Sequence, residues 1–260
     1  MKMHQLKLWS QVGFITSALF FGSSVRAETN HAADAVNQSA YQGVVIQQML
    51  MGFAKVGMNL KPEKSEKNLH QAISRFDGQL SDLLNAGAEN PSITALKEVK
   101  SLWDSVKQKL SSIPEKAAVQ PLFKDLEKLL DLSDQAANQM INNAGMENSD
   151  IFILAARQRM LSQRMAALYM LMAWRLESDD YAVKFKQTVA EFRSNHLKLK
   201  ESVAANPEIG TKLESVDKVL IWFDKAAEST SGKYVPTIIQ RSANKILNIQ
   251  DDVAKKYAGL

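Results

Sequence analysis

The sequence contains no cysteine in 260 residues. Disulfide bonds, thiolate metal sites and lipoprotein anchoring through a modified cysteine are therefore excluded. Long apolar runs are absent too: the clearest, residues 12–24, is shorter than the roughly 20 residues that a membrane-spanning helix requires. Runs of alternating β-branched and aromatic residues bounded by hairpin turns are also missing, so the sequence does not predict a β-sheet.

The first residues have the pattern of an export signal. Lys2 and Lys7 make a basic start, residues 12–24 form a short apolar run, and the run ends in Val25-Arg26-Ala27. Small residues at these positions suit a signal peptidase, so we expect residues 1–27 to be a signal peptide cleaved after Ala27. The alternative is an uncleaved membrane anchor. With cleavage, the protein is expected in a bacterial periplasm.

The charge balance argues against a nucleic-acid partner. The chain has 32 basic and 28 acidic residues, but Lys2, Lys7 and Arg26 belong to the leader, which leaves 29 basic residues against the same 28 acidic ones. No basic block with interleaved aromatic residues stands out as a surface for phosphates. The mature protein is therefore expected to be nearly neutral, with no nucleic-acid partner.

Catalytic patterns are not apparent either. We find no nucleophile–base pair, no paired carboxylates in an apolar setting and no glycine-rich phosphate loop, so we expect no enzymatic activity and no cofactor. His31, His70 and His196 lack the spacing of metal ligands and are expected at the surface or at helix caps. Trp103, Trp174 and Trp222 are expected in the core or at bundle ends.

Apolar residues recur with helical spacing along almost the whole chain and predict an all-α protein. Helices are predicted over residues 34–60, 65–85, from 91, 121–141, 150–177, 179–204, from 207 and 236–257, with the clearest break at residues 142–145. Asn206-Pro207 repeats Asn90-Pro91, and residues 45–57 can be aligned over residues 156–168. We therefore predict two tandem up-and-down four-helix bundles, residues 28–145 and 146–260. One irregular helical domain is the alternative.

Residues 155–169, AARQRMLSQRMAALY, carry three arginines among apolar and small residues. On a helix, Arg157 and Arg164 lie almost in line beside an apolar stripe, and Arg159 lies about 140° round from Arg164. Arg159 shares its face with Ala155, Ser162 and Ala166, whose small side chains allow a second helix to approach closely. Because burying an arginine is costly, the segment is either part of a salt-bridge network or, together with a second helix, a receptor for a small anion.

This arginine segment resembles the signature helix of the PilJ/NarX-like family, the sensory domains of type IV pilus chemotaxis transducers and nitrate/nitrite sensor kinases. The family motif, approximately AGRQRMLSQRM, matches residues 157–165, and Ala156 stands where the family usually has glycine. The resemblance implies a four-helix bundle in which Arg159 holds the anion at a helix–helix dimer interface and Arg164 is a second basic position. Ile46, Gln48 and Phe53 occupy the arginine positions in the aligned first half, which is therefore a degenerate copy that could supply the partner helix.

From these residues we expect a periplasmic, non-enzymatic sensory or ligand-binding module. Arg157, Arg159, Ser162 and Arg164 are the candidate ligand-binding residues, for a small oxyanion such as nitrate or nitrite. Because no kinase or methyl-accepting segment is present, a sensed signal must pass to a membrane receptor or transducer. The protein could form a homodimer or an internal pseudo-dimer of its two halves. The competing hypothesis is a structural or adaptor bundle whose arginines are paired internally.

Overall fold

The computed structural model describes residues 21–86, 92–176, 180–228 and 233–260. These residues form eight helices and no strand: α1 (Phe21–Gly57), α2 (Pro62–Asn85), α3 (Ile93–Leu110), α4 (Lys116–Ala144), α5 (Ser149–Ala173), α6 (Asp180–Ser202), α7 (Pro207–Glu228) and α8 (Pro236–Ala258). The all-α prediction is confirmed. Over the described part of the chain, no helix has the length and apolar character of a membrane span.

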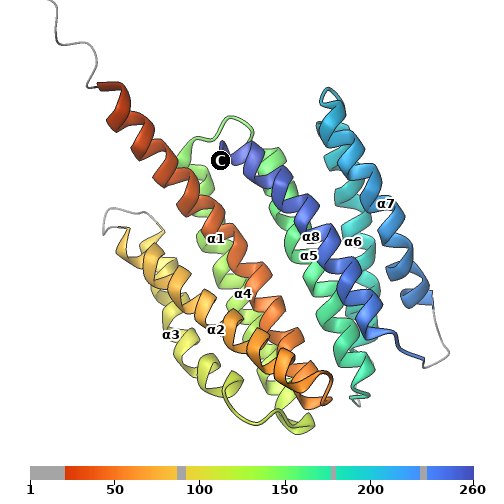
Figure 1. The fold of residues 1–260 in the computed structure, drawn as a ribbon. Helices are drawn as coiled ribbons and strands as arrows, with labels where there is room; N and C mark the ends of the chain where they lie inside the picture. Colours follow the sequence, from red (N-terminus) through yellow and green to blue (C-terminus); the bar gives the residue numbers. More distant parts are fainter. Residues whose placement is uncertain (1–20, 87–91, 177–179, 229–232) are drawn as a thin grey trace, which may run out of the picture.

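The helices form two groups of four (Figure 1). In the first group, consecutive helices from α1 to α4 pack against each other, and α4 also packs against α1. Helices α5 to α8 have the same arrangement. The groups meet mainly where α1 packs on α5. Below, α1–α4 are called the first half and α5–α8 the second half. One hydrophobic core runs through both halves.

The break between the halves lies where the sequence predicts it. Helix α4 ends at Ala144, and Gly145 follows with a φ of 58°, a left-handed conformation that glycine adopts without steric cost. The start of α4 differs from the prediction, because the helix begins at Lys116 and Pro121 lies inside it. Proline was expected to mark the helix start, but it lies in the second turn, where it removes one backbone hydrogen bond of the helix. The predicted cleavage after Ala27 falls within α1, and residues 1–20 lie outside the described part.

Helices α1 and α5 are parallel and closely packed. A Cβ atom added to Gly43 would lie 3.1 Å from the side chain of Met160, and one added to Gly57 would lie 2.1 Å from the Trp174 ring. Both pairs are 117 positions apart in the chain. Two points of contact with the same separation place the two helices in register along their length.

This register differs from the alignment of residues 45–57 over 156–168, whose separation is 111 positions. A separation of 116 is within one residue of these contacts and matches Gln42, Gln47 and Met49 with Gln158, Gln163 and Met165. The first-half counterparts of Arg157, Arg159 and Arg164 are then Tyr41, Gly43 and Gln48. No arginine occupies these positions in this alignment either.

Helix α5 is buried around nearly its whole circumference, whereas the sequence pattern predicted a single apolar stripe. The reason is that α6 and α8 cover one side and α1 covers another. Trp222, predicted in the core or at a bundle end, is 42% exposed on α7. Trp103 itself is fully buried, and its ring N–H donates to Asp77 over 2.8 Å.

Candidate functional site

Arg157 is neutralised by two carboxylates. Its Nη1 donates to Asp134 on α4 over 3.1 Å, and its Nε donates to Glu191 on α6 over 2.8 Å. The side chain is 39% exposed. A partly solvated guanidinium with two acidic partners has little need of an external anion.

Arg164 is held by one carboxylate in a bidentate pair. Its Nη1 and Nη2 donate to the two oxygens of Glu127 over 2.5 and 2.6 Å. The side chain of Arg164 is 13% exposed and that of Glu127 is 26% exposed. The planar fork of a guanidinium matches a carboxylate in this geometry, which gives a strong and directional contact.

The two acids of α4 are spaced like the two arginines of α5. Glu127 and Asp134 are seven residues apart, as are Arg157 and Arg164, and the order of the pairs makes the two helices antiparallel. Helix α4 belongs to the first half and α5 to the second. These salt bridges therefore connect the halves, which is the internal pairing that the adaptor hypothesis requires.

Arg159 is different because it is wholly buried, with 0% of its surface exposed. Its Nη1 donates to Asn37 on α1 and to Asp251 on α8, both over 2.8 Å. The guanidinium carbon lies 5.2 Å from the centre of the Tyr41 ring. The Nε and Nη2 atoms have no hydrogen-bond partner among the described residues. One edge of this buried cation is thus satisfied and the other is not.

The charges around Arg159 do not balance. Asp251 also accepts from Lys255 over 2.8 Å, so one carboxylate is shared by two cations. Burial alone raises the pKa of Asp251, but hydrogen bonds from Lys255 and Arg159 outweigh it and hold this pKa below its usual value. Burial lowers the pKa of Arg159, and Arg75 nearby acts in the same direction. The surroundings of Arg159 therefore favour a further negative charge.

Ser162 does not join the arginines. Its hydroxyl is fully buried and donates to the backbone carbonyl oxygen of Arg159 over 2.7 Å, a contact within the helix. The predicted ligand-binding role of Ser162 thus has no support in its geometry. Its small side chain has the packing role expected of that face, together with the buried Ala155 and Ala166.

Several residues at this site were not predicted from the sequence. The acidic partners Glu127, Asp134, Glu191 and Asp251 lie on three helices remote in the chain, and only the matched seven-residue spacing of the first two could have indicated them. His196, expected at the surface or at a cap, is 2% exposed and bonded to Asp217 over 3.0 Å. No cluster of metal-ligating side chains occurs within the described ranges. His31 lies outside the side chains that are described.

In comparisons with known proteins, the chain matches no family model, no curated protein and no solved structure.

Proposed function

We propose that this chain is a periplasmic, non-enzymatic sensory module of PilJ/NarX-like type that binds a small oxyanion such as nitrate or nitrite against Arg159. The supporting observation is the edge of the Arg159 guanidinium formed by Nε and Nη2. It is fully buried, carries permanent charge and lacks a protein acceptor. This edge presents two parallel N–H donors, an arrangement that suits the two oxygens of a planar oxyanion.

The position of Arg159 also provides a route for a signal. The side chain extends from α5 to Asn37 on α1 and Asp251 on α8, and so touches both halves. An anion bound to its free edge adds a contact at this junction and alters the packing of α1 against α5. The proposal includes a membrane receptor or transducer that responds to this change.

Titration of the purified mature chain with nitrate, nitrite and small carboxylates tests the proposal. We expect saturable heat in calorimetry and a rise in melting temperature. Arg159→Gln should lose both, whereas Arg193→Gln should keep both, since Arg193 is an exposed arginine paired with Asp224 on the far helices α6 and α7. Absence of any response of the wild-type protein at millimolar ligand contradicts oxyanion binding at Arg159.

A second candidate is the structural or adaptor bundle. It is favoured by the salt bridges of Arg157 and Arg164, which already connect the halves without any ligand. If the adaptor function is correct, none of the anions binds and Arg159→Gln lowers the free energy of unfolding by several kcal/mol, because Asp251 loses its buried partner. Anion binding therefore separates the two functions, because the Arg159–Asp251 pair contributes to stability in both.

A further inference from the structure

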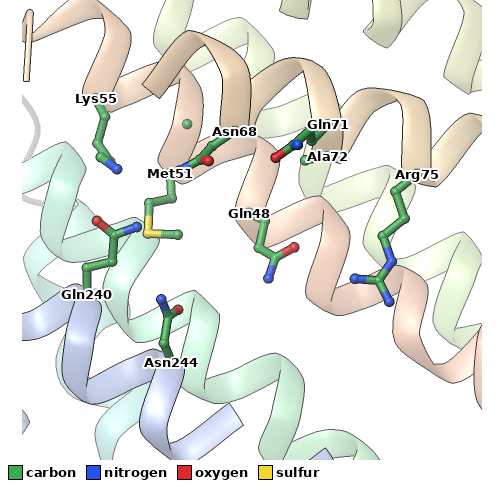
Figure 2. A pocket seen from close by; sticks show the side chains of 10 residues that line it. Gln48, Met51, Lys55, Asn68, Gln71, Ala72, Arg75, Gln240 and Asn244 are labelled. Atoms are coloured by element: carbon green, nitrogen blue, oxygen red, sulfur yellow. The ribbon is translucent and has the colours of Figure 1, made fainter. Parts of the chain in front are cut away.

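A polar groove lies at the junction of the two halves, separate from the arginine partners described above. It consists of two adjoining cavities of about 250 and 180 Å³ between α1, α2 and α8. Both are lined by Lys55, Asn68, Gln240 and Asn244, so they form one continuous depression. Figure 2 shows the larger cavity, with Lys55 and Arg75 at its two ends and amide side chains between them.

The groove is lined by cations and amides, and neither cavity is lined by an acidic residue. Its five cationic side chains come from three helices and a turn: Lys55, Lys61, Lys64, Arg75 and Arg241. Elsewhere in this protein, most arginines and many lysines face a carboxylate. Five cations around one depression repel one another, and this repulsion is relieved by an anion that enters it.

Lys55 is the central cation of the groove. It is only 4% exposed and lines both cavities. Within the described residues, no carboxylate lies at salt-bridge distance from its ammonium group, whereas the other buried cation, Arg159, has Asp251. Burial lowers the pKa of Lys55, and the charges of Lys64 and Lys61 lower it further. The Lys55 side chain is thus largely buried while its ammonium group points into the groove without an acidic partner, a position that favours an anion beside it.

The backbone adds positive potential at the smaller cavity. Helix α2 begins at Pro62 directly after Lys61, and α8 begins at Pro236 directly before Thr237. Lys61 and Thr237 both line the smaller cavity. The N-terminus of a helix carries a partial positive charge and free N–H donors. Lys61 itself has a left-handed φ of 52°, so the turn fixes this helix start beside Lys55.

We propose that the groove binds a small organic anion with two or more carboxylate or phosphate groups. One anionic group pairs with Lys55 and the cations at the α2 and α8 N-termini, and a second pairs with Arg75 at the opposite end. The amides of Gln48, Gln240 and Asn244 donate hydrogen bonds between these ends. A monovalent anion neutralises only one end and binds more weakly.

The groove also has a route to the buried arginine. The guanidinium of Arg75 lies 4.3 Å from the centre of the Tyr41 ring, and that of Arg159 lies 5.2 Å from the same centre. A ligand that draws Arg75 into the groove changes this stack. The groove is nevertheless a separate site, and its occupancy does not depend on oxyanion binding at Arg159.

Calorimetric titration of the mature chain with citrate at low ionic strength tests the proposal. Succinate and inorganic phosphate serve as further multivalent probes, acetate as the monovalent comparison, and sodium chloride of equal ionic strength as the control for screening. We expect one saturable site for citrate, with acetate at least tenfold weaker. Equal responses to citrate and to matched sodium chloride overturn the proposal.

Variants locate the binding. Lys55→Met should weaken citrate binding at least tenfold, whereas Lys218→Met, at an exposed lysine of α7, should leave it unchanged. If Lys55→Met does not fold, the exposed Arg241→Gln at the rim provides the same test with a smaller loss. Citrate binding that survives both groove variants refutes the assignment. The two sites are distinct if Lys55→Met still responds to nitrate and Arg159→Gln does not.

Discussion

Asp251→Asn gives the sharpest test of how this fold supports its buried arginine. The substitution keeps the size of the side chain and removes its charge. Arg159 is then left wholly buried with amide partners only, on Asn37 and at position 251. Lys255 also loses its partner, but it is 51% exposed and contributes little.

The size of the effect follows from the pair geometry. With an N–O distance of 2.8 Å, the charge centres are about 4 Å apart, and an effective dielectric constant near 20 gives an attraction of about 4 kcal/mol. Asp251 is 21% exposed, so solvent screening reduces this figure, and we expect a loss of about 3 kcal/mol. For a protein of this size, such a loss lowers the melting temperature by about 6–12 °C.

Urea denaturation followed by circular dichroism measures the change, with Asp252→Asn as the matched control. Asp252 is the next residue along the chain, is 59% exposed and pairs with Lys212 over 3.1 Å, so its substitution should cost less than about 1 kcal/mol. If the two asparagine variants are equally stable, Arg159 does not depend on Asp251 for its compensation, and the reasoning on the buried cation fails.

Two further predictions concern packing and pH. Gly57→Ala should destabilise the protein, since a Cβ there lies 2.1 Å from the Trp174 ring. Gly78→Ala meets nothing within 4 Å and should stabilise α2 by up to about 1 kcal/mol. Thermal denaturation compares the two variants, and an unchanged stability of Gly57→Ala contradicts the close α1–α5 contact. Burial lowers the pKa of His196 below 6.5, although Asp217 opposes this effect, so the unfolded chain binds the proton more readily. Stability contributed by neutral His196 should thus be present above pH 6.5 and be lost as pH falls below it, and His196→Gln should flatten this slope in denaturation measured at several pH values.

The sequence predicts the helices well and their partners poorly. Helical periodicity and the end of α4 before Gly145 depend on residues close in the chain, so both can be predicted from a single sequence. The predicted start of α4 is wrong because the helix begins before Pro121 and contains it, which no local pattern indicates. Arg159 was recognised as unusual, yet Asn37 and Asp251 are 122 and 92 positions away, and no local pattern points to them. The groove depends on helices from both halves coming together, which is a property of tertiary packing.

The contact of α1 with α5 has a consequence for the protein cut at the Gly145 linker. Each fragment retains four helices, but the apolar surface that α5 presents to α1 becomes exposed to solvent. The two fragments should therefore reassemble when mixed, and the salt bridges of Arg157 and Arg164 to α4 should stabilise the complex. The second fragment alone should pair with itself, with another copy of α5 in place of α1.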